Sequence, residues 1–313
     1  MDLKSKLLDP AQSVLLYGTT PPRHGTPDDQ IGAAVEKLAA RISGLPLDGV
    51  VVYDIQDEAG RTHQPRPFPF ARTVDPRRYA RLLTAHSGRP AIAYKALGTT
   101  TEPAWREWLV ETRKSFAIEF LSVVGRPTSG VKYPMALSRA IRIAAGPEGG
   151  SNSGLTVGGV VIAERHSMQR SESARMLAKG LGGCSYFISQ TVYHAHPTQR
   201  LLRDYLRDCR GAGVEPRRVV LTFSPCGREK TLAFIRWLGV NVAPETERAI
   251  LDAARPLAKS IEICCDNLRR ILDQPYADKL PLGVNVESVS INRDEIDASI
   301  DLFHALREVL AGK

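Results

Sequence analysis

The chain has 313 residues, of which 43% are hydrophobic and 24% are charged. This ordinary globular composition excludes a disordered or fibrous chain. No apolar run approaches the roughly 18 residues of a membrane span, and residues 1–6 lack the basic-then-apolar layout of a secretory signal. We therefore expect a soluble, cytoplasmic protein.

The chain carries a net charge of +8, from 42 basic and 34 acidic residues. Such a surplus is compatible with nucleic acid or with a small anionic ligand. The basic residues are spread along the chain and aromatic residues make up only 6% of it, so no basic-aromatic patch for single strands is evident. We expect neither nucleic acid nor a membrane as partner. The odd number of cysteines, five, favours reduced thiols over a disulfide framework.

Eight short apolar runs alternate with longer amphipathic stretches. The runs predicted as strands are residues 14–18, 49–54, 91–95, 118–124, 157–164, 185–190, 218–223 and 283–289. The stretches predicted as helices are residues 27–43, 76–86, 102–114, 133–145, 171–181, 197–211, 228–238 and 294–310. An extra helical pair is expected near 244–272, before the last strand.

Short apolar runs of this kind are typical of parallel strands that are buried on both faces. Eight strand-helix pairs in a chain of this length favour an α/β fold of the closed (β/α)₈ TIM-barrel type over an open doubly wound sheet. The turn at residues 18–25 is also not the G-x-G-x-x-G loop of a doubly wound dinucleotide fold. We predict one barrel domain over residues 1–313.

In such a barrel, the site lies at the carboxyl ends of the strands. Polar side chains follow most of the predicted strands there: Tyr53, Asp54, Tyr94, Arg126, Glu164, His166, Gln190, His194, Cys226, Glu287 and Arg293. Some of these positions have simpler explanations, since Asn292 can cap the last helix and Cys226 has no evident base to activate it. Glu164 and His166 could ligate a metal, but we favour a site without one.

Four short motifs, in barrel order, resemble those of the methylenetetrahydrofolate reductase family. They are Tyr-Gly-Thr-Thr-Pro-Pro-Arg at 17–23, Glu-Arg-His at 164–166, Ile-Ser-Gln at 188–190 and Ser-Ile-Asn-Arg-Asp-Glu at 290–295. That family is a (β/α)₈ barrel that reduces 5,10-methylenetetrahydrofolate to 5-methyltetrahydrofolate with NAD(P)H through FAD. The resemblance implies a divergent member with folate as substrate and NAD(P)H as cofactor, with or without FAD.

The resemblance also implies roles for single residues. Gln190 would hydrogen-bond the pterin, because an amide donates and accepts at once. Arg293 would meet the benzoyl-glutamate end, because a guanidinium binds a carboxylate bidentately. His166, Arg175 and Lys179 would fall where the family holds FAD.

Glu172, Arg175 and Lys179 share one face of the predicted helix at 171–181 through their i, i+3 and i+7 spacing. That face either meets a pyrophosphate or is a solvated face of salt bridges, and we put the solvated face slightly ahead.

Three departures from the family fall at its flavin and proton-transfer positions. The acid of its first strand falls on Gly18, a carboxylate of its fourth strand on Arg126, and a flavin-contacting histidine of its third strand near Tyr94. We therefore expect Arg126 among the substrate contacts and Tyr94 among the cofactor contacts.

Glycine cannot transfer a proton, so another carboxyl has to replace the missing acid. Glu164 is our candidate for the catalytic acid, with Asp54 and Glu287 across the barrel mouth as alternatives, because burial at a barrel mouth raises a carboxyl pKa.

Two functions remain open from the sequence. The protein is either a reductase-like enzyme that interconverts 5,10-methylene- and 5-methyltetrahydrofolate with a nicotinamide, or a non-redox protein that binds 5-methyltetrahydrofolate or partners a methyl transfer. The direction of reaction and the oligomeric state are not given by the sequence.

Overall fold

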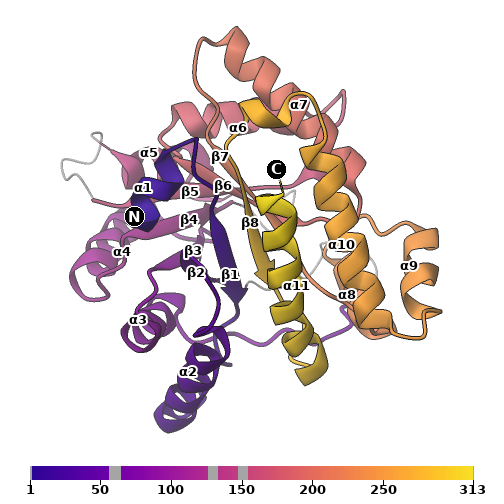
Figure 1. The fold of residues 1–313 in the computed structure, drawn as a ribbon. Helices are drawn as coiled ribbons and strands as arrows, with labels where there is room; N and C mark the ends of the chain where they lie inside the picture. The colour runs from indigo at the N-terminus through magenta and orange to yellow at the C-terminus, as the bar shows by residue number, and fades with distance from the viewer. Residues whose placement is uncertain (1, 56–64, 126–132, 147–153, 313) are drawn as a thin grey trace.

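The computed structural model describes residues 2–55, 65–125, 133–146 and 154–312. Eight strands, all parallel to their neighbours, close into a barrel in the order of the chain, and helices surround them (Figure 1). The predicted (β/α)₈ barrel is confirmed.

The strands are β1 Leu15–Thr19, β2 Gly49–Val52, β3 Ala91–Ala96, β4 Phe120–Val124, β5 Thr156–Val161, β6 Tyr186–Thr191, β7 Arg218–Phe223 and β8 Leu282–Glu287. The helices are α1 Leu3–Leu8, α2 Asp28–Ile42, α3 Pro76–Ser87, α4 Glu102–Lys114, α5 Leu137–Ala145, α6 Glu172–Leu181, α7 Ala195–Gly211, α8 Glu229–Trp237, α9 Pro244–Leu251, α10 Pro256–Leu272 and α11 Arg293–Ala311.

Most boundaries differ from the sequence prediction by one or two residues, and three differences are larger. Strand β5 ends at Val161 instead of 164, because a turn of 3₁₀ helix, Ala163–Arg165, follows it. Helix α5 begins at Leu137, four residues late, since Pro134 disfavours helical backbone at the residue before it. Helix α1 was not predicted, and its six residues begin where the Asp2 side chain accepts a hydrogen bond from the Ser5 amide (2.7 Å).

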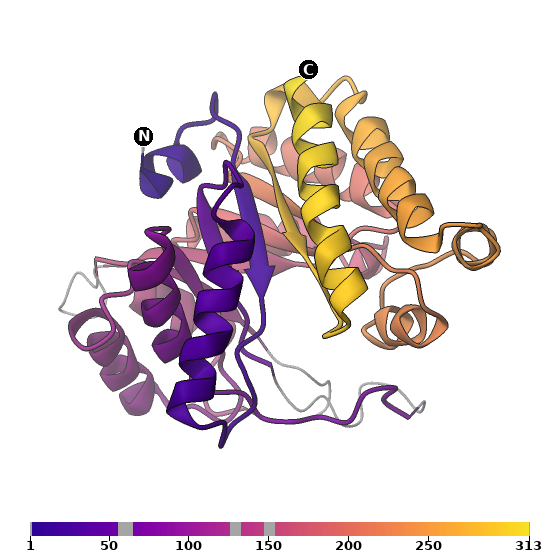
Figure 2. The ribbon, with the colours of Figure 1, turned by 60° about the horizontal axis from the view of Figure 1, so that its bottom comes forward.

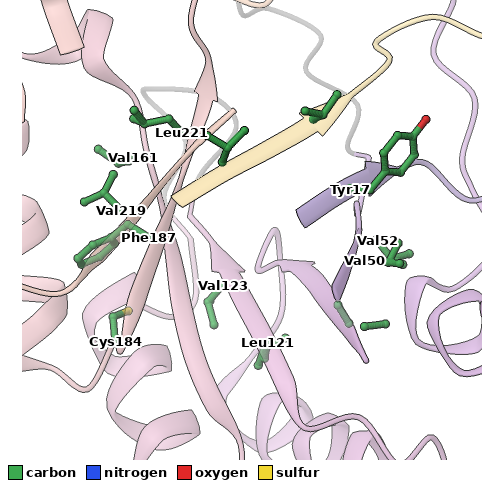
Figure 3. Packing of buried hydrophobic residues seen from close by; sticks show 14 of the residues in the cluster. Tyr17, Val50, Val52, Leu121, Val123, Val161, Cys184, Phe187, Val219 and Leu221 are labelled. Atoms are coloured by element: carbon green, nitrogen blue, oxygen red, sulfur yellow. The ribbon is translucent and has the colours of Figure 1, made fainter. Parts of the chain in front are cut away.

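The strands are buried on both faces. Outward-facing residues such as Val50, Leu121 and Leu221 belong to the large cluster between barrel and helices (Figure 3). Alternate residues fill the barrel interior: Leu16, Val51, Ile92, Tyr94, Phe120, Tyr186, Ile188 and Val220. This double burial explains why the strands are nearly continuous apolar runs in the sequence.

The amino end of the barrel is closed. Helix α1 lies at the end away from the strand arrowheads (Figure 2), and its Leu3 and Leu7 pack into the interior cluster. The buried Arg218 side chain donates to the carbonyls of Leu7 (3.3 Å), Leu282 (2.9 Å) and Asp9. A ligand site is therefore left to the opposite end, where the strands finish.

No helix among the described residues is both long enough and apolar enough to cross a bilayer.

Candidate functional site

A cavity of about 730 Å³ lies at the carboxyl ends of the strands. Its wall is formed by the ends of β2, β3, β4, β5, β6 and β8 and continues between α5 and α6. The volume falls within the roughly 300–1,000 Å³ that is usual for small-molecule sites. We describe it from the barrel end outward to the helices.

At the barrel end, Glu287 and the ring of Tyr53 line the cavity. The buried Asn285 amide donates from Nδ2 to the Tyr53 hydroxyl oxygen (2.9 Å) and to Oγ1 of Thr222 (3.2 Å). Burial raises the pKa of the Glu287 carboxyl to about 7, and hydrogen bonding from Tyr53 offsets only part of that effect. Glu287 is thus close to half ionised at neutral pH.

Gly18 is opposite Glu287 in the pairing of β1 with β8. A Cβ atom at position 18 would lie 2.7 Å from the Tyr53 hydroxyl oxygen, 2.9 Å from its Cε2 atom and 3.1 Å from Cβ of Glu287. Glycine is required here because the ring of Tyr53 occupies this space. The neighbouring strand β8 places the carboxyl of Glu287 beside this glycine.

Tyr94 lines the cavity beside Tyr53, with ring centroids 4.9 Å apart and planes at 77°. Burial raises the pKa of both tyrosines well above 10. Both phenols are therefore neutral at physiological pH and present flat aromatic surface together with a polar edge.

Gln190 lies at the end of β6 and lines the cavity. Its Nε2 atom donates to the Leu238 carbonyl (2.6 Å), which fixes the orientation of the amide. Its Oε1 atom is buried and has no hydrogen-bond partner among the residues that the structure describes. A buried acceptor without a partner is costly, so a hydrogen bond from an N–H group to this oxygen would be favourable.

The outer part of the cavity is basic, with Arg66, Arg165, Arg170, Arg175 and Lys179 in its lining. Five cations there outnumber the three carboxyl groups in the lining, so the surface favours an anionic ligand. The sequence reasoning missed Arg66 and Arg170.

The guanidinium of Arg66 lies over the rings of Phe234 and Trp237, 5.4 and 4.9 Å from their centroids. Residues 66–70 read Arg-Pro-Phe-Pro-Phe, and this arginine beside two aromatic residues is the sequence feature that could have pointed to Arg66.

Glu172, Arg175 and Lys179 do share one face of α6, which is a cluster of salt bridges that is only partly solvated, since the Arg175 side chain is 47% exposed. The side chains of Glu172 and Lys179 are 4% and 14% exposed, and both residues line the cavity. Glu172 lies 3.4 Å from Arg175 and 3.8 Å from Lys179, whose ammonium also donates to the Val160 carbonyl (2.7 Å). Burial lowers the pKa of Lys179.

No family model matches this sequence, and no curated protein matches it. A solved structure does: an uncharacterized protein from Clostridium thermocellum that binds two copies of 5-methyl-5,6,7,8-tetrahydrofolic acid. It is 30% identical to this chain with a TM-score of 0.81, and the match covers 99% of each chain. This chain belongs to the family of that clostridial protein.

Two other solved structures are similar to this chain at lower sequence identity and lower TM-score. One is oxaloacetate acetylhydrolase in complex with the inhibitor 3,3-difluorooxalacetate (13% identity, 99% of this chain and 84% of that chain, TM-score 0.49). The other is dihydropteroate synthase from Xanthomonas albilineans with 4-aminobenzoic acid (13% identity, 96% and 94%, TM-score 0.45). Similarity at this level does not bear on function.

Three of the residues predicted for the site do not line the cavity of this protein. Glu164 is carried away by the 3₁₀ turn after β5, where its Oε1 accepts from the Asn241 amide (3.4 Å) and burial raises its pKa. His166 follows the same turn, and its Nε2 lies 2.9 Å from Oδ2 of Asp204.

The third is Arg293, the first residue of α11. Its side chain is 85% exposed and lies 3.5 Å from Asp297, so it faces solvent. The predicted substrate contact Arg126 lies outside the described residues. Of the predicted site residues, the cavity brings together Gln190, Tyr94, Arg175 and Lys179.

Nucleophilic and metal chemistry have little support from the described residues. All five cysteines are buried and unpaired, and burial raises the pKa of Cys226 to about 12, which keeps it a neutral thiol. No group of three or more metal-ligating side chains occurs within the described ranges.

Proposed function

We propose that the protein binds a reduced folate, 5-methyltetrahydrofolate, in this cavity without redox chemistry. The observation that carries the proposal is that Gln190, whose buried Oε1 has no hydrogen-bond partner within the described ranges, lines a cavity with a basic outer wall. The 30%-identical relative, which binds two copies of this folate, supports the same ligand here.

The chemistry of the ligand matches the two ends of the cavity. The pyrimidinone ring of a reduced pterin is flat, and the pterin carries several N–H donors, which suits the acceptors of Gln190 and Glu287 and the rings of Tyr53 and Tyr94. The glutamate end carries carboxylates, which suit the guanidinium groups of the outer wall. In this arrangement the pterin lies toward the barrel and the glutamate toward α6.

A second candidate is a reductase of the methylenetetrahydrofolate reductase kind, and one observation favours it. Glu287 places a carboxyl with a pKa of about 7 beside Gly18, where the resembling family carries its acid. In this candidate NAD(P)H supplies the hydride, and Glu287 protonates the folate.

The residues that the resemblance assigns to FAD fit a flavin poorly. His166 is paired with Asp204 off the cavity, and the ammonium of Lys179 is taken up by Val160 and Glu172. Only Arg175 and Tyr94 remain for it, so we derive no step through a flavin.

Calorimetric titration of the purified protein with 5-methyltetrahydrofolate tests the proposal. We expect binding, and about tenfold weaker binding by Gln190→Ala, the cost of one lost hydrogen bond in a buried site. The matched control is Gln199→Ala, an exposed amide on α7 that donates to the Arg270 carbonyl and should leave affinity unchanged. Equal affinity of Gln190→Ala and the parent would remove the basis of the proposal.

The absorption spectrum and a nicotinamide assay separate the two candidates. A colourless protein that binds the folate and does not oxidise NAD(P)H supports the non-redox function. Oxidation of NAD(P)H that depends on 5,10-methylenetetrahydrofolate would establish the reductase instead.

A further inference from the structure

The carboxyl of Glu287 is partly buried at the barrel end of the cavity, and no cation among the described residues is paired with it. Within the part of the chain that the structure describes, burial is the main influence on its pKa, and no lysine or arginine forms an ion pair with it. Burying a carboxyl without a cation is unfavourable. Such a group is retained where a ligand uses it.

Near Glu287, the donor and the acceptor of the hydrogen bond between Asn285 and Tyr53 can be assigned. The Asn285 amide can only donate from Nδ2, and it donates to the oxygen of Tyr53. The Tyr53 proton is thereby left for the neighbouring Glu287 carboxyl, and the Tyr53 hydroxyl lowers the pKa of that carboxyl. This arrangement favours the carboxyl as an acceptor.

We propose that Glu287 is the residue that recognises the pterin ring, its carboxylate accepting hydrogen bonds from the 2-amino group and the N3–H of that ring. These two donors lie side by side, in the guanidine-like arrangement that a carboxylate binds with two parallel hydrogen bonds. The inference rests on the proposed function and deepens it, because it assigns the end of the folate that enters the barrel.

Binding of this kind requires the ionised form of Glu287, so it is coupled to release of a proton. Only the ionised fraction of the free protein is competent to bind. With the free carboxyl half protonated near neutrality, the affinity should fall about tenfold from pH 8 to pH 6.

Among the described residues, the other groups that face Glu287 do not titrate in this range. Tyr17 on β1, Tyr53 after β2, Tyr94 on β3 and Tyr193 after β6 are the tyrosines in its field, and burial raises the pKa of each above 10. Gly18, Gln190, Thr222 and Asn285 are neutral.

The other carboxyls of the cavity already have donors in the protein. Asp54 accepts from the Ala96 amide (2.8 Å), and Glu172 is paired with Arg175 and Lys179 on α6.

The test is calorimetric titration of the full chain with 5-methyltetrahydrofolate from pH 6 to pH 8.5. Glu287→Gln keeps the shape of the side chain and removes its charge. We expect its affinity at pH 8 to be about 10- to 100-fold weaker than that of the parent, since a hydrogen bond to a charged group is lost. We also expect its affinity to be independent of pH.

The matched control is Glu164→Gln, which removes a different carboxyl with a raised pKa that lies off the cavity. It should keep the parent affinity and pH profile. A parent affinity that rises on acidification, or a pH dependence that survives in Glu287→Gln, overturns the inference while the folate site stands. Absence of binding by the parent at every pH overturns the proposed function and the inference together.

A ligand analogue gives a second readout that does not depend on how the variant folds. The 5-methyltetrahydrofolate analogue that lacks the 2-amino group should bind the parent at least tenfold more weakly at pH 8. Glu287→Gln should discriminate little between the two ligands, which is the signature of a direct contact. Equal loss in both proteins would contradict the assigned contact.

Discussion

Glu287 is held in a position that costs the folded protein stability. Its pKa is raised from an ordinary value of 4.5 to about 7, so the folded state retains a proton that the unfolded chain releases. The associated stability is present below pH 4.5 and is lost as the pH rises through about 7. A ligand-binding role accounts for keeping a residue that is unfavourable for folding.

Glu287→Gln is therefore expected to be more stable than the parent at pH 8. The amide carries no charge to bury, so the difference in free energy of unfolding between the two proteins should widen by about 3 kcal/mol from pH 4.5 to pH 8. Urea unfolding followed by circular dichroism at the two pH values measures it. A difference that stays constant with pH would show that the carboxyl titrates normally.

The position of a side chain at the cavity could be predicted from the sequence where a strand end fixes its direction. Gln190 and Tyr94 lie in strands, and alternation along a strand places them on the inner face. Glu164 was predicted as the last residue of the fifth strand and His166 as following it, because the apolar run hides the turn that ends β5 at Val161. Arg293 was assigned to the site from its motif, and a motif does not show toward which side the first turn of α11 directs its side chains.

At the scale of elements, the ring of Tyr53, which follows β2, packs against β1 because β1 has a glycine at position 18. Gly18→Ala places a methyl group against the ring of Tyr53, which is held by Asn285 and has little freedom to move. We expect a loss of about 1–3 kcal/mol in the free energy of unfolding, as for other overpacked sites.

Gly32→Ala is the matched control for that substitution. Position 32 lies within α2 with nothing near a Cβ atom, so alanine should stabilise the protein by roughly 0.5–1 kcal/mol through helix propensity. Chemical unfolding measures both. If both alanines stabilised the protein, the space beside Tyr53 would be larger than the structure gives.

Helices α6 and α11 allow a direct comparison of two arginines. Arg175 and Arg293 are each paired with a carboxylate on their own helix, at 3.4 and 3.5 Å, but only Arg175 lines the cavity. Arg175→Ala should weaken binding of 5-methyltetrahydrofolate about fivefold, the worth of a partly exposed ion pair. The loss should grow with a polyglutamate tail.

Arg293→Ala should bind the mono- and polyglutamate forms as the parent does, because its guanidinium faces solvent. Titrations with both forms of the folate measure the comparison. A larger loss for Arg293→Ala than for Arg175→Ala would restore the role that its motif suggested.

At the scale of the whole molecule, the barrel was predictable because its strands are buried on both faces. Runs such as residues 49–54 and 218–223 have no polar alternation, and eight of them in sequence leave few folds to consider. Helix α1 and the closure of the amino end were not predictable. They depend on Arg218, whose hydrogen bonds to Leu7 and Asp9 join residues more than 200 positions apart.

Arg218→Ala tests how much this closure contributes to stability. Three carbonyls would lose their donor and a buried volume would be emptied, so we expect a loss of about 3 kcal/mol or more in the free energy of unfolding. Arg217→Ala, on an exposed neighbour, should change it by less than about 0.5 kcal/mol. Urea unfolding measures both, and similar losses would show that Arg218 does not hold the closure.

The closed amino end also constrains the order of ligand exchange. With α1 and Arg218 beneath the barrel interior, small molecules reach Glu287 and Gln190 from the carboxyl side, past the arginines near α6. Any second molecule bound nearer to that opening obstructs the first, so the inner occupant arrives first and departs last. Residence time at the barrel end then depends on the concentration of whatever binds outside it.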